Sequence, residues 1–321
     1  MPDEPCSRGP EADPGVNVSL VTTFMNEEAG IEHFLDSIFS LSRLPDELVL
    51  VDGGSTDRTV LLVEKYTSSR ARGIPVKLII DRNCNISAGR NRAVREAAHD
   101  VIAVTDAGSH LDKNWLKEIV RPFERDSGID IVAGSYRVEA TSVWERLSSS
   151  YLMPSPDLIS RIMPSGRSSC FRRKAWEDVG GYPEWLNHAE DSYFAIKLRE
   201  TDHTFCFSPD ALVRWKPRPD PLSFFKQYFL YAVGDERAGL YRSKYIRKIL
   251  MYVLGAVLLA RGLTVPLFVL AGVYLVLMMG RYWARGKDRA LVFFLPPVVI
   301  IHDIAQVAGY LYGKITCGDP S

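Results

Sequence analysis

The strongest constraint on the fold comes from a pattern that repeats in the first 105 residues: an apolar run, a polar turn and then a helical pattern. The apolar runs are rich in valine, leucine and isoleucine and occupy residues 16–24, 48–51, 76–80 and 101–105. Strands that alternate with helices at this spacing predict an α/β fold with a mostly parallel sheet and helices on both faces. In such sheets, ligands bind beyond the carboxyl ends of the strands. The polar turns of this chain follow those ends, so a binding site is expected there.

The helical patterns start at recognisable residues. Asn26 is a suitable N-cap for the first helix, and Glu27 and Glu28 suit the positive end of a helix dipole. Two further helices are expected over Arg58–Tyr66 and Gly89–Ala98. The region from about residue 112 to residue 217 has a less regular pattern.

Charge and hydropathy divide the chain into two unlike parts. The whole sequence has 39 Lys and Arg residues and 39 Asp and Glu residues, which excludes a generally basic nucleic-acid-binding protein. Residues 221–321 nevertheless have 12 Lys and Arg residues against 5 Asp and Glu residues, and nearly all long apolar runs lie after Ile249. We therefore expect an acidic soluble domain followed by a basic, membrane-bound tail.

Two apolar segments, 249–260 and 263–279, are separated only by Arg261 and Gly262. Together they exceed the roughly 20 residues that one membrane-spanning helix needs, and both flanks are basic. Because positive flanks favour the cytosolic side, an even number of crossings is expected, with a tight hairpin at Arg261. One long tilted helix is the alternative.

A further span-length segment covers residues 290–313, interrupted by Pro296 and Pro297. It contains His302 and Asp303, and ionisable residues at membrane depth usually face protein or water. The sequence thus predicts two or three membrane helices.

The cysteines and the N-terminal residues favour a cytosolic location for the first domain. The five cysteines form no CxxC pair, so neither a disulfide framework nor a zinc site is expected. Residues 1–15 lack the apolar stretch of a signal peptide. We expect a multi-pass membrane protein whose catalytic domain lies in the cytosol.

Two of the polar turns contain residues suited to chemistry. The turn 52–57 has glycines that let a ligand approach the backbone and acids that can accept from a base or ribose, although a simple capped turn with Ser55 as N-cap explains it equally well. Asp106 lies at the tip of a buried strand, where its carboxylate can bind Mg²⁺ or Mn²⁺ bridging two phosphates.

With these turns in place, the sequence resembles the inverting family 2 glycosyltransferases of the GT-A fold. The resemblance rests on an ordered set of motifs between Val16 and Gly239: VTTFMNEE, VDGGSTDRT, SAGRNRAV, VTDAG, GGYPEWLNHAED and QYFLYAVGDERAG. It implies a Rossmann-like nucleotide-binding domain that transfers a sugar from a nucleotide sugar.

The resemblance also implies roles for individual donor-side residues. Thr23 and Glu27 would line the nucleotide pocket, and Asp52 would accept from the base. Asp57 would support that loop, and Arg90 would lie near the phosphates.

On the other side of the reaction, the family pattern implies a general base. Glu190 and Asp191 match its "ED" pair, in which Asp191 would deprotonate the acceptor hydroxyl and Glu190 would orient the acceptor or Asp191. Helix capping is the structural alternative for this pair.

The metal motif departs from the family pattern. Asp106 holds the first DxD position, but the second is Gly108, and residues 211–216 lack the histidine that many relatives supply. Either Asp106 holds Mg²⁺ or Mn²⁺ through water and diphosphate oxygens, or cations neutralise the leaving group. The candidate cations are Arg167, Arg172, Arg214 and Lys216, for each of which a structural ion pair is the simpler interpretation.

The predicted organisation has five parts: a disordered tail over residues 1–15, a GT-A catalytic domain over 16–220, an amphipathic interface region over 221–248, transmembrane helices over 249–313 and a C-terminal tail over 314–321. The predicted function is a membrane-anchored inverting glycosyltransferase that uses a UDP- or GDP-sugar and a lipid-linked or glycan acceptor.

The main alternative is a catalytically degenerate GT-A domain that binds nucleotide sugar as a membrane partner protein. A nucleotidyltransferase ranks last, because residues 25–28 lack the basic glycine-rich loop. A processive synthase is not expected, because two or three spans are too few to enclose a pore.

Overall fold

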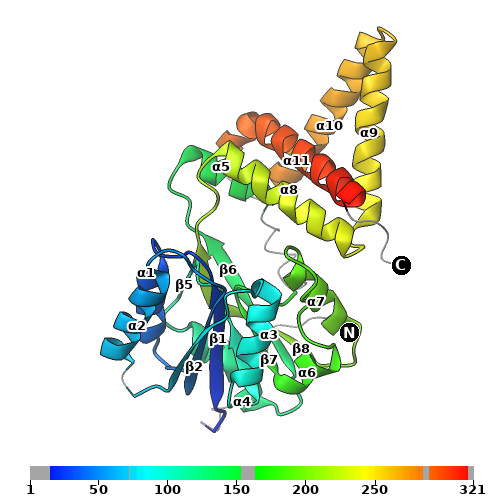
Figure 1. Ribbon diagram of the computed structural model, residues 1–321. Coiled ribbons are helices and arrows are strands. Elements are labelled where there is room, and N and C mark those ends of the chain that lie inside the picture. Colours follow the sequence, from blue (N-terminus) through cyan, green and yellow to red (C-terminus); the bar gives the residue numbers. More distant parts are fainter. Residues whose placement is uncertain (1–14, 72, 153–162, 285–288, 317–321) are drawn as a thin grey trace. The chain divides into compact units, whose positions relative to one another are not determined.

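The computed structural model describes residues 15–71, 73–152, 163–284 and 289–316 (Figure 1). The chain divides into two compact units, which we call the sheet unit (Met1–Glu139 with Ile159–Lys216) and the helical unit (Ala140–Leu158 with Pro217–Ser321). The tail expected over residues 1–15 and the last five residues of the C-terminal tail lie outside the described residues, apart from Gly15. Residues 140–158 join the helical unit, although the sequence pattern assigns them to the catalytic domain.

The sheet unit is built on one eight-stranded sheet of order β3-β2-β1-β4-β7-β6-β8-β5. The strands β1 to β4 are parallel, as are β6 and β8, whereas β7 runs antiparallel to β4 and β6, and β5 runs antiparallel to β8. The mostly parallel sheet is therefore confirmed. The strands are β1 (Val18–Phe24), β2 (Glu47–Asp52), β3 (Val76–Ile80), β4 (Val101–Val104), β5 (Ser109–Leu111), β6 (Ile131–Val138), β7 (Ser169–Arg172) and β8 (Phe205–Trp215).

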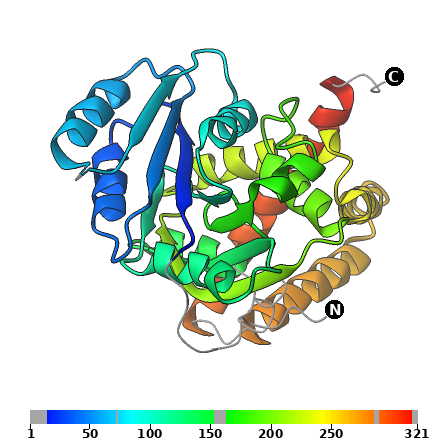
Figure 2. The same ribbon diagram turned by 90° about the horizontal axis from the view of Figure 1, so that it is seen from below.

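Helices cover both faces of this sheet (Figure 2). Because side chains alternate along a strand, Leu48 and Leu50 pack into one apolar cluster, and Val49 and Val51 pack into the other. The first cluster includes residues of α1 (Ile31–Phe39), α2 (Thr59–Arg70) and α4 (Trp115–Arg125). The second includes residues of α3 (Ile86–Glu96), α6 (Arg173–Asp178) and α7 (Glu190–Arg199). The near-continuous apolar strands are thus explained by burial on both sides.

Two local interpretations are wrong. Asn26 is not an N-cap: its φ is 55°, its Oδ1 accepts from the Thr56 amide at 2.9 Å, and α1 begins only at Ile31. Ser55 does not cap α2, which begins at Thr59.

The helical unit consists of helices only, among the residues described. They are α5 (Val143–Leu152), α8 (Pro221–Arg237), α9 (Arg242–Ala260), α10 (Thr264–Ala284), the short 3₁₀ helix η2 (Arg289–Phe294) and α11 (Leu295–Thr316). The chain reverses at Gly262, whose φ of 68° favours glycine, and the Leu263 amide donates to the Leu258 carbonyl at 2.9 Å. This geometry confirms the predicted hairpin at Arg261 and excludes one long helix.

The helix α11 contains a buried acid that contacts both α9 and α10. Asp303 is completely buried and forms an ion pair with Lys248 of α9 and a hydrogen bond with Tyr274 of α10. It therefore faces protein, as expected for an ionisable residue in an apolar segment. Pro296 and Pro297 lie in the first turn of α11, where proline does not interrupt the helix.

Gly309 and Gly313 let α11 approach α8 closely. A Cβ on Gly309 would lie 2.2 Å from the carbonyl oxygen of Phe229, and one on Gly313 would lie 3.2 Å from the Cβ of Glu236. Two small residues four positions apart are a common device for close helix packing.

We expect Gly309→Ala to lower the stability of the helical unit by about 1–3 kcal/mol, because the added methyl forces the two backbones apart. Gly272→Ala is the matched control, since a Cβ at Gly272 in α10 meets nothing within 4 Å. Thermal unfolding of both variants in detergent checks this. Equal melting temperatures would contradict the packing role of Gly309.

Candidate active site

The turn after β2 is shaped by Asp52. Its carboxylate is completely buried and accepts from the Gly54 amide at 3.0 Å, the Ser55 amide at 3.0 Å and the Ser55 hydroxyl. Gly54 has a φ of 97°, and a Cβ there would lie 2.7 Å from the Arg82 carbonyl oxygen, so glycine is required. Asp52 therefore fixes the turn after β2.

Asp57 joins this turn to the loop after β1. It accepts from the Thr59 amide at 3.0 Å and from the Glu28 amide at 3.2 Å. The hydrogen bond from the Thr59 hydroxyl lowers the pKa of Asp57, so the carboxylate remains charged. Glu27 belongs to the same arrangement, because its amide donates to the Thr59 hydroxyl at 2.9 Å.

Thr23 of β1 lies against Gly89 of α3. Its hydroxyl donates to the Val51 carbonyl at 3.1 Å, and a Cβ on Gly89 would lie 2.3 Å from that hydroxyl oxygen. The glycine of the SAGRNRAV motif is therefore needed for helix packing. One position later, Arg90 points into the site.

Arg90 joins the two acidic motifs. Its guanidinium contacts Asp106 Oδ1 at 2.7 Å and Glu190 Oε1 at 2.8 Å. Arg90 as a whole is only 2% exposed. Burial opposes the charged form, but Asp106 and Glu190 outweigh it and raise the pKa of Arg90. Residues from α3, from the turn after β4 and from the first turn of α7 thus meet at one buried cation.

The "ED" pair opens α7. Glu190 is buried against Arg90, and its burial raises the pKa of its carboxyl group. Asp191 is only half-buried, and its Oδ1 accepts from the Ser192 amide at 2.7 Å within its own helix. The preceding Ala189 has a φ of 62°, an unusual conformation for a residue other than glycine. The two acids therefore have unlike surroundings, with Asp191 the more accessible.

Two tyrosines complete these surroundings, and no family motif assigned either of them a role. Tyr182 lies under Arg90, whose guanidinium carbon is 5.3 Å from the ring centroid. Burial raises the pKa of the Tyr136 phenol in β6, on which the charges of Arg167 and Asp191 also act. Tyr182 falls inside the GGYPEWLNHAED motif, so the sequence could have identified it as a site residue. Tyr136 lies in the irregular region, where no motif marks it.

A third missed residue is Gly166. A Cβ there would lie 2.3 Å from Arg90 Nη2 and 3.1 Å from Asp106 Oδ1. Only glycine lets this part of the chain pass so close to the Arg90–Asp106 ion pair.

Asp106, just after β4, is the candidate carboxylate for a metal ion. Gly108 adds no side chain, and no group of three His, Cys, Asp or Glu residues among those described is placed to hold an ion. The donor set therefore does not fit an ion held by protein alone. A hard carboxylate oxygen does fit an Mg²⁺ or Mn²⁺ ion that a diphosphate also coordinates.

The four candidate cations differ in their ion pairs and in their distance along the chain from Asp106. Arg167 lies over the Trp215 ring at 4.7 Å, and its carbonyl accepts from the Thr105 hydroxyl at 2.9 Å, beside Asp106. Arg172 instead pairs with Asp100 at 3.1 Å. This pair lies at the start of β4, at the opposite end of the strand from Asp106. Arg214 pairs with Asp112 and Glu139, and Lys216 is exposed. The simpler structural interpretation therefore holds for Arg172 and Arg214.

We expect Arg90→Met to lower the unfolding free energy by about 3–5 kcal/mol, because it leaves Glu190 buried without its cation. Arg92→Met on the same helix is the matched control, since Arg92 forms an exposed pair with Glu96 and contributes little. Denaturant unfolding of both variants checks this. Equal unfolding curves for the two variants would contradict the structural role of the buried Arg90.

Comparison with known proteins identifies the family of the chain. Residues 19–181 match glycosyl transferase family 2, and residues 101–300 match glycosyl transferase family group 2. The O-antigen chain rhamnosyltransferase RfbN of Salmonella typhimurium is 26% identical over 229 residues, which cover 67% of this chain and 71% of that protein. The succinoglycan biosynthesis protein ExoA of Rhizobium meliloti is 25% identical over 228 residues, covering 67% and 68%.

A solved structure extends the likeness to nearly the whole chain. It is the mannosyltransferase PcManGT of Pyrobaculum calidifontis in complex with GDP-Man and Mn²⁺, with a TM-score of 0.61 and 20% identity over 96% of this chain and 92% of that one. At this identity the likeness concerns the fold, which is GT-A. The family match covers more than half of the chain. The chain therefore belongs to glycosyl transferase family 2 and is a glycosyltransferase.

Proposed function

We propose that this protein is a membrane-associated inverting glycosyltransferase that transfers a sugar from a nucleotide sugar to a glycan or lipid-linked acceptor. The observation that carries the proposal is the buried Arg90, which joins Asp106 to the "ED" pair at the start of α7. The relatives named as a rhamnosyltransferase and a succinoglycan biosynthesis protein support an acceptor of polysaccharide type.

The donor side of the reaction needs neutralisation of the leaving diphosphate. Asp106 would hold Mg²⁺ or Mn²⁺ together with the diphosphate oxygens, and the ion would supply charge stabilisation to the leaving group. The Mn²⁺ bound to PcManGT supports this assignment. Thr23, Glu27, Asp52 and Asp57 would form the nucleotide side, and Arg167 would add a cation near Asp106.

The acceptor side needs a base. Glu190 is occupied by Arg90, whereas Asp191 is half-buried and sits one residue further along the helix. Asp191 therefore takes the proton of the acceptor hydroxyl while that oxygen bonds to the anomeric carbon and the bond to the diphosphate breaks. Attack opposite the leaving group inverts the anomeric configuration.

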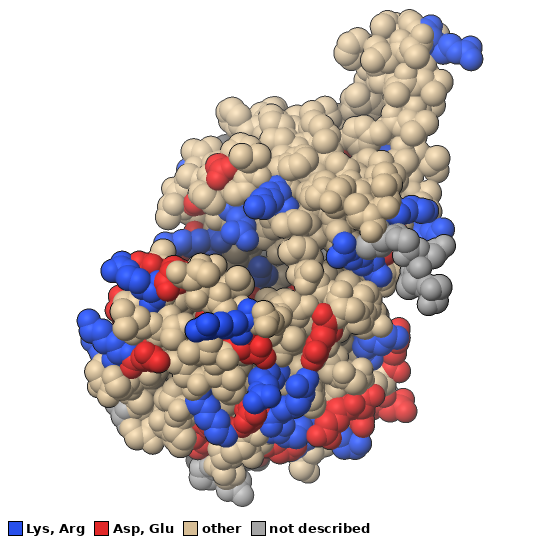
Figure 3. Space-filling model, viewed as in Figure 1, with Lys and Arg blue, Asp and Glu red and all other residues tan. Residues whose placement is uncertain are grey.

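The helical unit supports association with a membrane. Within the described residues, the stretches 264–283 and 291–316 are long and apolar enough to cross one, the first without burial in the structure and the second half-buried. The α9–α10 hairpin carries few charges apart from basic residues at its tip and ends (Figure 3). We assign these ends to the cytosolic face, because basic residues favour it.

Asp191→Asn is expected to lower kcat by about 10²–10⁴-fold while nucleotide-sugar binding persists, because the amide cannot accept the proton. The control is Glu200→Gln, which alters an exposed ion pair at the far end of α7. Nucleoside diphosphate release is measured for both. Undiminished transfer by the Asp191 variant would overturn its assignment as the base.

The donor class is tested by thermal shift against UDP-, GDP- and dTDP-sugars with and without Mg²⁺ or Mn²⁺. A donor at about 100 times its Kd should stabilise the protein by about 2.7 kcal/mol. Asp106→Asn should remove the part of this shift that depends on the metal. Metal-dependent shifts that survive this substitution would contradict the role of Asp106, and binding without turnover would support a non-catalytic protein.

A further inference from the structure

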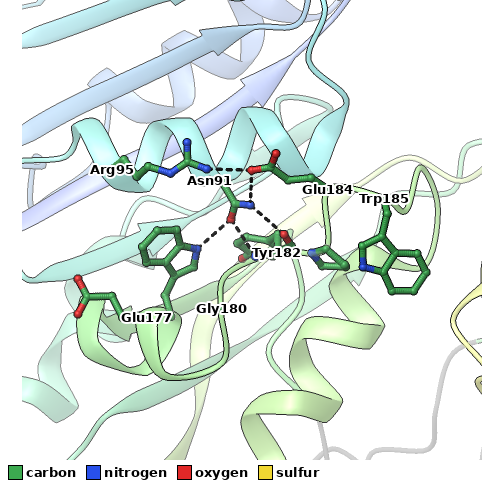
Figure 4. Close-up of a pocket in the computed structure, with 9 residues that line it drawn as sticks. Asn91, Arg95, Glu177, Gly180, Tyr182, Glu184 and Trp185 are labelled. Atoms are coloured by element: carbon green, nitrogen blue, oxygen red, sulfur yellow. Dashed lines mark hydrogen bonds and ion pairs between the residues drawn. The ribbon is translucent and has the colours of Figure 1, made fainter.

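The loop Gly180–Ala189, which leads into the "ED" pair, is held by side chains of α3. Figure 4 shows Asn91 beside Tyr182 and Glu184, with hydrogen bonds to both. The loop begins with Gly180 and Gly181, whose φ values of 77° and 78° favour glycine. Its path is thus set by backbone conformation at one end and by α3 along its length.

Asn91 uses its whole amide group in this contact. Its Oδ1 accepts from the Tyr182 amide at 2.8 Å and from Trp176 Nε1 at 3.0 Å. Its Nδ2 donates to the Tyr182 carbonyl at 2.8 Å and to Glu184 Oε1 at 2.9 Å. A side-chain amide has two donor hydrogens and two acceptor lone pairs, so its hydrogen-bonding capacity is filled. The residue is 3% exposed, which strengthens each of these bonds.

A second asparagine, Asn85, holds the loop further along. Its Oδ1 accepts from the Ala88 amide and caps α3, while its Nδ2 donates to the Glu184 carbonyl at 2.6 Å and to Asn187 Oδ1 at 3.0 Å. The start of α3 and the loop are therefore fixed to each other at two points.

The contact reaches the proposed base through Tyr182. The Tyr182 ring stacks on Phe194 of α7 at 4.0 Å between centroids, and Arg90 lies 5.3 Å from the same ring. Asn91 therefore fixes a residue that touches both α7 and the cation bound to Glu190.

A cavity of about 470 Å³ adjoins this contact and is lined by residues that include Asn91, Arg95, Trp176 and Glu184. Its polar groups bond to one another: Arg95 pairs with Glu184, and Glu184 accepts from Asn91 (Figure 4). These bonds consolidate the loop, so we assign the cavity no ligand.

We infer that Asn91 is a positioning residue that holds the loop Gly180–Ala189 so that Asp191 meets the acceptor. This inference rests on the proposed function, because it assumes that Asp191 is the base. A displacement of about 1 Å in a reacting group can lower the rate by about 10²-fold, so the loss of this contact should appear in kcat.

The test compares Asn91→Ala with Val94→Ala. Val94 is completely buried on the same helix in the sheet core, so its substitution provides a destabilised control without loss of the loop contact. In Asn91→Ala we expect amide hydrogen exchange over residues 182–193 to be at least tenfold faster than in the unsubstituted protein. In Val94→Ala, exchange over these residues should be unchanged once the lower global stability of that variant is taken into account. Equal exchange of the loop in the two variants would overturn the inference.

Kinetics supply the second readout, with the nucleotide sugar that gives the largest shift in the thermal screen. Asn91→Ala should lower kcat about 10–100-fold with donor binding within twofold, and should cause less than twofold further loss in the Asp191→Asn background. A full further loss there would mean that Asn91 does not act through Asp191. If Asp191→Asn alone is fully active, the proposed function fails instead. If Asn91→Ala does not fold, Asn91→Ser is used with the same criteria.

Discussion

The site depends on one buried cation. Arg90 is almost completely buried and is held by Asp106 on one side and Glu190 on the other. These three side chains come from parts of the chain up to 100 residues apart. A buried charge is tolerated only when it is paired, so Arg90 depends on Asp106 and Glu190, and Glu190 depends on Arg90. The end of β4 and the start of α7 are fixed relative to each other for this reason.

Much of the fold was predictable because strands that are buried on both faces have near-continuous apolar sequences, as β1 to β4 do. The pattern predicted the parallel half of the sheet and the polar turns after its strands. It did not predict the antiparallel strands around β7, because short strands between irregular loops lack a period. Asn26 looked like an N-cap from residue type alone, but its side chain bonds to Thr56, thirty residues away.

The site was predictable only where motifs carried it. The family pattern indicated Arg90, Asp106, Glu190 and Asp191, yet it did not indicate that Arg90 bridges two of these acids. Gly166 gave no signal, because its role arises from its close approach to Arg90 and Asp106 in distant segments. In the helical unit, the apolar runs predicted the hairpin turn, whereas the close packing of α11 on α8 depends on two glycines that hydropathy does not distinguish.

The most direct test of this account is an experimental structure of the protein with a nucleotide sugar and Mn²⁺. The account predicts the diphosphate and the metal ion beside Asp106, the base beside the turn of Asp52, and the anomeric carbon facing Asp191. A donor sugar bound with its anomeric carbon turned away from Asp191, or a diphosphate far from Asp106, would contradict it.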